Sequence, residues 1–292
     1  MKIIDTTTFF EEDMIMDIRF NILDPYVDKF IVCESSYTHS GKEKKINFNI
    51  SDYPKFKDKI IHVILEKEPE NLIIKENLTA QEKRMNSINR IKTQRNYIKN
   101  FLNNFSPDDY IIYSDNDEIP NLEKFNFNSN SKKFIIFNQK IFYYKLNLSL
   151  PDLSWFGSKA CKLKNLKSID YLRSIKNRQY SFFRFDTLFS DNKHNSVEIV
   201  NSGGWHFSNL KTIESLENKY LNDENHAEYE IQNNSIEKIK DNVRRHVVPY
   251  NYKAKKDSVK RFNETKLTKV DIDELPKYLK KNIIKYEKWI ID

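Results

Sequence analysis

Glycine is scarce in this sequence, which has 4 Gly and 8 Pro among its 292 residues. Neither a G-x-G-x-x-G sequence nor a P-loop sequence occurs, and these are the glycine-rich patterns that bind dinucleotides and nucleotide phosphates. A Rossmann dehydrogenase or a P-loop enzyme is therefore disfavoured. Few Gly and Pro also argue against long flexible linkers, so we expect one large α/β domain or two small ones.

Cysteine and long apolar runs are scarce as well. Cys33 and Cys161 are the two cysteines, too few for a disulfide framework, and both lie in apolar segments. We therefore expect buried free thiols in a reducing compartment. The sequence has no run of about 18 apolar residues and no signal-peptide core after Met1. These absences predict a cytoplasmic protein without a transmembrane helix.

The positive charge is confined to one end of the chain. Residues 235–292 contain 16 Lys and Arg against 9 Asp and Glu, an excess equal to the net charge of +7 of the whole chain. A nucleic-acid-binding protein would carry basic and aromatic residues across a recognition surface, so we expect no nucleic-acid partner. A non-catalytic basic binding protein is the alternative from a different functional class.

The last part of this basic tail has an amphipathic pattern. Its apolar stripe, which lysines flank, consists of Leu275, Tyr278, Leu279, Ile283, Tyr286, Trp289 and Ile290. A basic amphipathic helix fits peripheral contact with the anionic inner face of a membrane, where a lipid-linked acceptor would be found. The alternative is a helix that packs on the domain and leaves its lysines in solvent.

Strand and helix patterns alternate in the first part of the chain. Segments 1–5, 29–34, 60–65 and 110–113 predict strands, and segments 11–23 and about 81–103 predict helices. This alternation predicts an α/β fold with a mixed central sheet flanked by helices, which binds ligands at the carboxyl ends of its strands. Later segments, 133–137 and 140–144, resemble strands of an antiparallel extension, 212–222 a helix, and the tail is predicted to be helical.

The predicted strand 110–113 runs directly into three carboxylates, Asp115, Asp117 and Glu118. Unpaired carboxylates at the end of a buried strand are costly, so a positive charge is expected beside them. Mg²⁺ and Mn²⁺ take one or two carboxylates together with the oxygens of a diphosphate. A bend at Asn116 would aim Asp115 and Asp117 at one point, as a nucleotide-sugar transferase requires. The alternative is a polar turn after a strand.

Several segments match one family in order and spacing. They are 9–14, 18–21, 27–35, 38–42, 114–120 and 204–208, with Lys219 and His226-Ala227-Glu228 downstream. Over about residues 9–230 the chain resembles glycosyltransferase family 17, the family of the β-1,4-mannosyl-glycoprotein N-acetylglucosaminyltransferase. The resemblance implies a GT-A-type fold over residues 1–232, with a nucleotide half at about 1–120 and an acceptor half at about 121–232. A basic helical extension at 233–292 would follow.

The resemblance, together with the chemistry of the side chains, implies roles for eight residues. Glu12, Glu34, Arg95 and Asp115 would bind the donor; Asp115, Asp117 and His206 would bind Mn²⁺ or Mg²⁺; Trp155 and Trp205 would stack on a sugar. Asp115 would bind the metal directly or through water, or hold the ribose. Each role has a structural alternative: an ion pair between Arg95 and the acids, a cap or surface carboxylate for Glu34, and a place in the core for the aromatic residues.

The implied reaction is an inverting transfer of a sugar, GlcNAc from UDP-GlcNAc, onto a saccharide hydroxyl of a glycan or lipid-linked oligosaccharide. A different nucleotide-sugar donor is the alternative. The animal members carry an N-terminal membrane anchor, which this sequence lacks, so a protein N-glycan is not carried over as the acceptor. An inverting transfer needs a carboxylate base. The candidates, which the sequence does not rank, are Asp152, Asp186, Asp191, Glu198 and Glu118.

Overall fold

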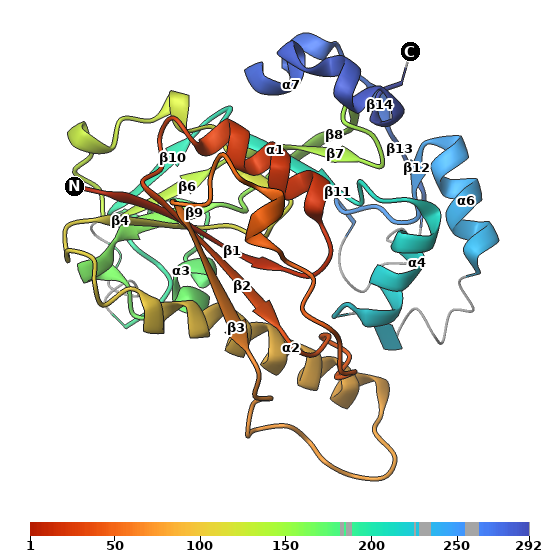
Figure 1. The fold of residues 1–292 in the computed structure, drawn as a ribbon, viewed down its shortest axis with the longest axis horizontal. Coiled ribbons are helices and arrows are strands. Elements are labelled where there is room, and N and C mark those ends of the chain that lie inside the picture. Colours follow the sequence, from red (N-terminus) through yellow and green to blue (C-terminus); the bar gives the residue numbers. More distant parts are fainter. Residues whose placement is uncertain (182–183, 185–188, 225, 228–234, 255–262, 292) are drawn as a thin grey trace.

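The centre of the molecule is a mixed sheet of seven strands (Figure 1), in a computed structural model that describes residues 1–181, 184, 189–224, 226–227, 235–254 and 263–291. Its strand order is β10-β6-β9-β4-β1-β2-β3. The bounds are β1 Ile3–Phe9, β2 Lys29–Ser35, β3 Ile60–Leu65, β4 Tyr110–Tyr113, β6 Phe134–Phe137, β9 Lys159–Lys162 and β10 Val197–Val200. Strands β3, β2, β1 and β4 are parallel, whereas β9 runs antiparallel between β4 and β6. The predicted mixed sheet is confirmed.

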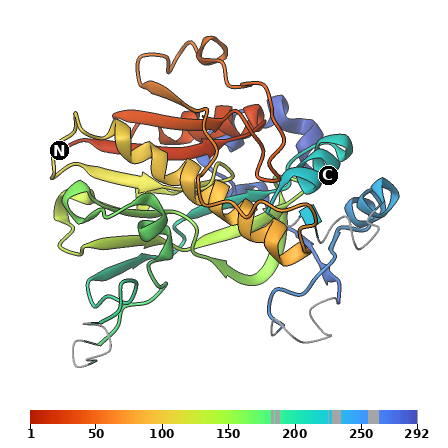
Figure 2. The ribbon, with the colours of Figure 1, turned by 90° about the horizontal axis from the view of Figure 1, so that it is seen from below.

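Helices cover both faces of this sheet (Figures 1 and 2). On one face, α1 (Asp13–Leu23) packs Phe20 into a cluster that includes Ile112. On the other face, α3 (Ile169–Ser174) and the 3₁₀ turn Ile98–Phe101, which continues α2 (Ala80–Tyr97), form a second cluster with Ile111. Ile111 and Ile112 are neighbours on β4, and neighbouring side chains of a strand point to opposite faces. The continuous apolar run of β4 is therefore explained by burial on both faces.

A second sheet of five strands extends the molecule, in the order β14-β8-β7-β11-β5. Its strands are β5 Glu118–Pro120, β7 Gln139–Tyr143, β8 Leu148–Trp155, β11 Gly204–Ser208 and β14 Thr268–Lys269. The two expected strands 133–137 and 140–144 do form, but they belong to different sheets, since β6 lies in the first and β7 in the second. β7 is antiparallel to β8 and parallel to β11. β5 begins at Glu118, the last residue of the acidic turn Asp115–Glu118, so this second sheet meets the first beside Asp115 and Asp117.

The C-terminal part of the chain is attached to the rest of the molecule through helix α6 (Ile236–Arg245) and strand β14. Helix α6 contacts α4 (Ile213–Asn222), and its Ile239 shares a cluster with Leu216. The short strand β13 (Thr265–Lys266) pairs with β12 (Val247–Val248), and β14 joins the five-stranded sheet through β8. The expected boundary between residues 232 and 233 lies outside the described residues, so it stays a prediction.

The amphipathic stripe near the C-terminus does not form one continuous helix. It consists of α7 (Lys277–Lys281) and a 3₁₀ segment (Ile283–Trp289). Leu275, Leu279 and Tyr286 are buried in the cluster that contains α1, and the Tyr286 hydroxyl donates to Asp17 of α1 at 2.7 Å. These contacts are those of the packed alternative, and the buried residues of the stripe are not available to a membrane. Within the described residues, no helix has the length and apolarity needed to span a bilayer.

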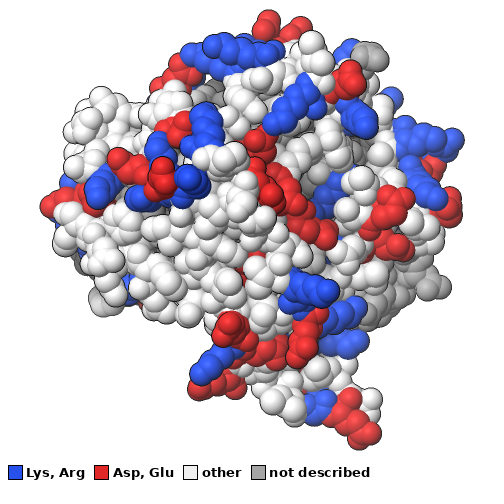
Figure 3. Space-filling view, in the orientation of Figure 1, with Lys and Arg blue, Asp and Glu red and all other residues white. Residues whose placement is uncertain are grey.

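The surface charges are mixed in sign. In Figure 3, lysines and arginines over α6 and α7 are interspersed with aspartates and glutamates. Ion pairs such as Arg245–Glu264 and Lys277–Glu123 contribute to this pattern. The described residues of this face therefore form no uniformly basic surface.

Both cysteines are buried and free, as predicted. Cys33 lies on β2 and Cys161 on β9. Burial raises the pKa of each thiol to about 12, so neither is a reactive thiolate near neutral pH.

Candidate active site

A cavity of about 390 Å³ lies at the carboxyl ends of β1, β2 and β4, where the two sheets meet. Six of the eight residues predicted for the site line it: Glu12, Arg95, Asp115, Asp117, Trp155 and His206. The segments that supply them lie far apart in the sequence. The α/β arrangement brings them together because parallel strands end at the same edge of a sheet.

Asp115 is held between two arginines. Arg95 of α2 lies 2.9 Å from its Oδ1 and Arg173 of α3 lies 2.8 Å from its Oδ2, and the Tyr113 hydroxyl donates to Oδ1 at 2.8 Å. Burial alone would raise the pKa of Asp115, but the two guanidinium groups outweigh it and hold the pKa well below its usual range. Arg95 and Arg173 thus supply the positive charge that was expected beside the carboxylates. The predicted alternative for Arg95, an ion pair with these acids, is present as the pair with Asp115.

Glu118 is a buried organising residue of the turn. Its carboxylate accepts from both terminal nitrogens of Arg173, from the Trp155 Nε1 at 2.6 Å and from the Asp115 backbone N–H at 3.0 Å. Gly157 packs against it so closely that a Cβ there would lie 2.3 Å from the Glu118 Cδ. A glycine is required at position 157 because any side chain would displace the carboxylate that orients Trp155.

A third arginine, which is fully buried, fixes the backbone of the acidic turn. Arg19 of α1 is fully buried and forms two hydrogen bonds with Asp5 on β1, at 2.8 and 2.6 Å. Its Nη1 donates to the Glu118 carbonyl at 2.7 Å. This contact satisfies a buried carbonyl of the first residue of β5 and ties the acidic turn to α1.

Asp117 lies beside His206 in the cavity. The His206 Nε2 lies 3.5 Å from the Asp117 Oδ1, and its ring stacks on Trp155 with centroids 4.7 Å apart. Burial acts to raise the pKa of Asp117, and the charge of His206 outweighs it, so this pKa lies below its ordinary value. The His206 Nδ1 is buried and has no hydrogen-bond partner among the residues that the structure describes. In contrast to Asp115, Asp117 has no arginine beside it in the described structure.

Glu12 closes one wall of the cavity. Its Oε2 accepts from the Asn116 side chain at 2.5 Å and from the backbone N–H groups of Phe10 and Glu11. The Lys211 ammonium lies 3.1 Å from its other oxygen. Burial acts to raise the pKa of Glu12, but Lys211 and the backbone donors lower it below the usual value. Glu12 therefore stays ionised and holds the middle residue of the Asp-Asn-Asp sequence.

His39 offers the cavity a fixed hydrogen-bond acceptor. The Gln94 Nε2 donates to the Cys33 carbonyl at 2.9 Å, which leaves the Gln94 Oε1 as an acceptor. The His39 Nε2 lies 3.3 Å from that oxygen and must carry the proton. Burial lowers the pKa of His39, so the ring is neutral and its Nδ1 has a free lone pair. The sequence analysis gave neither residue a role, although His39 lies in segment 38–42, which resembles the family.

Lys219 of α4 is the cavity cation without a carboxylate partner among the described residues. Its ammonium donates to the Asn209 Oδ1 at 2.9 Å, whereas the other two, Lys44 and Arg95, are paired with Glu34 and Asp115. Lys219 lowers the pKa values of both Glu12 and Asp117. Its position is thus close enough to the acids to act on an anion bound among them.

Two of the predicted site residues do not line the cavity. The Glu34 carboxylate is fully buried and accepts from the backbone N–H groups of Asn47 and Phe48, at 2.8 and 2.9 Å, and from Lys44. It holds the loop after β2, and its neighbour Ser35 lines the cavity instead. Trp205 donates from Nε1 to the Glu274 carbonyl at 2.9 Å and packs on the core. It cannot share a face with His206, because neighbouring residues of a strand point to opposite faces.

The candidate catalytic bases are scattered. Glu118 lines the cavity but is bound to Arg173, Asp191 is 86% exposed and paired with Lys167, and Glu198 lies on β10. Asp152 lines a different cavity, and Asp186, like Glu228, lies outside the described residues. Of the described candidates, none presents a free carboxylate to the main cavity.

Together, the fold and the site define a class: an α/β protein with a strongly charged ligand cavity at the strand ends of a mixed sheet. Glycosyltransferase family 17 matches residues 1–290, and the chain belongs to this family. It is therefore a glycosyltransferase. No curated protein matches the chain.

Two solved structures show a weak similarity to this chain. Both are of HddC from Yersinia pseudotuberculosis. The first is 13% identical with a TM-score of 0.35 and covers 70% of this chain and 92% of HddC. The second, complexed with GMP-PN, is 12% identical with a TM-score of 0.34 and covers 69% and 90%. Scores of this size do not establish a shared fold.

Proposed function

We propose that this glycosyltransferase transfers a sugar from a nucleoside diphosphate donor, UDP-GlcNAc, to a saccharide hydroxyl, with inversion and with Mn²⁺ or Mg²⁺ bound in the cavity of the acidic turn. The observation that carries the proposal is the contrast between the two aspartates. Asp115 is neutralised by Arg95 and Arg173, whereas Asp117 has no Lys or Arg in ion-pair contact among the described residues and lies 3.5 Å from His206. A carboxylate left without a strong cation in a buried site is suited to bind one.

The ligand atoms in the cavity fit a metal ion whose coordination shell is completed by oxygens of the substrate. Asp117 and His206 would hold the ion, and the unpartnered Nδ1 of His206 shows that this ring is not committed to another hydrogen bond. No group of three or more potential ligands occurs among the residues that the structure describes. Magnesium and manganese sites of transferases use one or two carboxylates and take further oxygens from a diphosphate. A bound ion would neutralise charge on the departing nucleoside diphosphate.

The remaining cavity residues support a role for each part of the donor. Lys219 would bind the diphosphate, because its ammonium has no carboxylate partner in the described structure. The neutral His39 would accept from a donor group of the nucleoside, such as the N3–H of uracil or a ribose hydroxyl. Trp155, oriented by Glu118, would pack against the transferred sugar. Asp115 would act through Arg95 and Arg173, whose orientation it fixes.

The acceptor that we propose is a glycan or lipid-linked oligosaccharide. The mixed surface charges, and a cavity lined by both charged and aromatic side chains, suit a polar saccharide substrate. A cytoplasmic location is part of the proposal, and the two buried free thiols are compatible with a reducing compartment.

Calorimetric titration with UDP, UDP-GlcNAc and GDP-mannose, each with and without Mn²⁺, tests the donor and the metal together. We expect UDP and UDP-GlcNAc to bind in a manganese-dependent way to the wild type, and Asp117→Asn to lose at least about tenfold in affinity. Asp273→Asn, at an aspartate that is 88% exposed and does not line the cavity, is the matched control. Binding that ignores manganese would remove the metal role of Asp117. No nucleotide binding under any condition would overturn the proposed function.

A further inference from the structure

A second cavity, of about 290 Å³, adjoins the first. Tyr252 lines both cavities, and its hydroxyl lies 2.6 Å from that of Tyr143, which lines only the first. Tyr252 is also one of the exposed large aromatic residues of the described structure, with 40% of the residue's surface accessible. An aromatic ring that is held by a hydrogen bond and exposed between two cavities can contact a ligand that occupies both.

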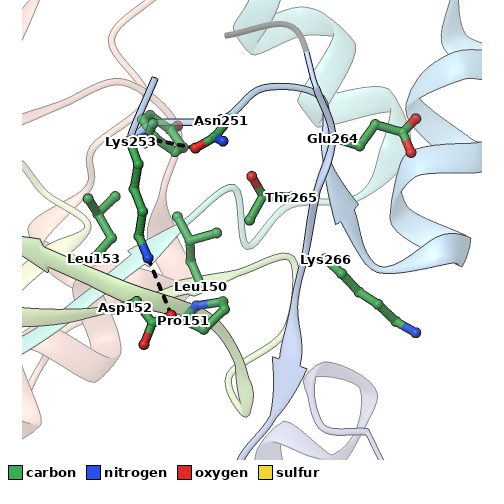
Figure 4. A pocket seen from close by; sticks show the side chains of 10 residues that line it. Leu150, Pro151, Asp152, Leu153, Asn251, Lys253, Glu264, Thr265 and Lys266 are labelled. Carbon is green, nitrogen blue, oxygen red and sulfur yellow. Dashed lines mark hydrogen bonds and ion pairs between the residues drawn. The ribbon is translucent and has the colours of Figure 1, made fainter. Parts of the chain in front are cut away.

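The walls of the second cavity come from two parts of the chain that are far apart in sequence (Figure 4). Residues 150–153 of β8 form one wall, and residues 251–253 with β13 form the other. The Lys253 Nζ lies 3.3 Å from the Asp152 Oδ2, which bridges the two walls. Asp152 has a φ of +56°, in the left-handed region that a non-glycine residue seldom adopts. Such a conformation is maintained at a cost and is common in binding sites.

The charges of this cavity select the class of ligand. Asp152 and Glu264 contribute two negative charges, and Lys253 and Lys266 contribute two positive charges. Asp152 is paired with Lys253, and the four charges of the lining sum to zero. A phosphate or another strongly charged ligand is therefore not favoured. Carboxylate, amide, ammonium and hydroxyl groups around an exposed ring suit a neutral ligand with many hydroxyl groups.

We propose that the second cavity binds the non-reacting sugars of an acceptor oligosaccharide, while the sugar that receives the transferred group lies beyond Tyr252 in the first cavity. This inference rests on the proposed transferase function. Binding energy from remote parts of a substrate helps to position its reacting group. The acceptor is consequently an oligosaccharide of at least two sugars, and Tyr252 is a positioning residue that stacks on one of them.

Saturation-transfer NMR and calorimetry with two ladders of saccharides test this assignment. The probes are mannose to mannotetraose and GlcNAc to its tetramer, each added in the presence of UDP and Mn²⁺. We expect affinity in at least one ladder to rise by about tenfold or more from the monosaccharide to the trisaccharide. Tyr252→Ala should abolish this gain, and Tyr252→Phe should retain most of it, because the ring remains. Asp152→Asn should reduce the gain and leave UDP binding unchanged.

Tyr26→Ala is the matched control, since Tyr26 is exposed to a similar extent, 38%, and lines neither cavity. The assignment is overturned if affinity does not depend on length, if no member of either ladder binds, or if the gain persists in Tyr252→Ala. UDP binding without any length-dependent saccharide binding would refute the proposed role of the second cavity and leave the proposed donor site standing. Length-dependent saccharide binding without UDP binding would support the second cavity and refute the proposed donor.

Discussion

The Arg173 Nη2 lies 2.8 Å from the Asp115 Oδ2 and 2.7 Å from the Glu118 Oε1. One guanidinium group thus neutralises Asp115 and Glu118, the first and last carboxylates of the acidic turn, whereas Asp117 lies beside His206. The planar guanidinium of Arg173 can donate to two carboxylates at once. Asp115 and Glu118 are therefore paired within the protein, and Asp117 is the candidate metal ligand.

Replacing Arg173 should destabilise the protein strongly. Arg173→Ala leaves the Glu118 carboxylate, whose side chain is 1% exposed, without its cation. Breaking a buried ion pair by removing one partner costs about 3 kcal/mol or more, so we expect the free energy of unfolding in urea to fall by about 3 kcal/mol. Arg173→Lys should recover part of this loss because it restores the charge but not the fork.

Arg178→Ala is the control for this measurement, because Arg178 is exposed and follows the same helix. It should change the unfolding free energy by less than about 0.5 kcal/mol. Equal effects of Arg173→Ala and Arg178→Ala would show that the buried pair does not contribute as inferred.

Gly157→Ala should act through Glu118. The added Cβ would lie 2.3 Å from the Glu118 Cδ, and overpacking of this kind costs about 1–3 kcal/mol. We expect lower thermal stability and loss of the hydrogen bond between Trp155 and Glu118. A double-mutant cycle with Glu118→Ala checks the cause, since Gly157→Ala should cost much less once the carboxylate is gone. Additive effects would contradict this explanation.

Strands in the first 120 residues could be predicted because their sequence patterns are unambiguous. β3 and β4 occupy the expected positions 60–65 and 110–113, where short apolar runs end at polar residues. The acidic turn was predictable for an electrostatic reason, since three carboxylates at a buried strand end require a cation. The expected helix at about 81–103 forms as α2 and the 3₁₀ turn that continues it. The buried residues of α2, which are Asn86, Ser87, Arg90 and Gln94, are polar, and the buried apolar contacts come from Ile98 and Leu102 beyond its end.

The rest of the site depends on contacts that leave no local signal. Arg173 is one basic residue among 49, on a helix of six residues, and nothing in its neighbourhood marks it as the partner of Asp115. The placement of Trp205 was missed because β11 was not predicted as a strand. Once residues 204–208 are a strand, alternation alone separates Trp205 from His206. Glu34 lies at the end of its strand as predicted. The loop after this strand brings the backbone N–H groups of Asn47 and Phe48 back to its carboxylate, and no sequence pattern indicated that contact.

Tryptophan fluorescence should report binding in the cavity through Trp155. Trp155 stacks on His206 and lines the cavity, whereas Trp205 donates to the Glu274 carbonyl away from it. We expect UDP with Mn²⁺ to change the emission of the wild type and of Trp205→Phe by similar amounts. Trp155→Phe should lose most of the change. A signal that depends on Trp205 would place the bound nucleotide elsewhere.

Stability should rise with pH above neutrality because of Lys159. Its ammonium is buried behind Arg173 and donates to the carbonyls of Arg173 and Ile175 at 2.6 Å. Burial, with a smaller effect of the Arg173 charge, lowers the pKa of Lys159 from 10.5 to about 7. Between these two values the unfolded chain binds a proton that the folded protein has released. Unfolding therefore takes up a proton, and the free energy of unfolding should increase by up to about 1.4 kcal/mol per pH unit in this range.

Urea unfolding at pH 7, 8 and 9 measures this slope, and Lys159→Met should flatten it because the methionine side chain has a similar length and does not titrate. Lys281→Met, at an exposed lysine of α7, is the control and should keep the wild-type slope. If the wild type and Lys159→Met have the same slope, Lys159 stays protonated in the folded protein. The two carbonyl contacts would then outweigh the cost of burying its charge, and the C-terminal end of α3, which carries Arg173, would be held by a cation at all pH values tested.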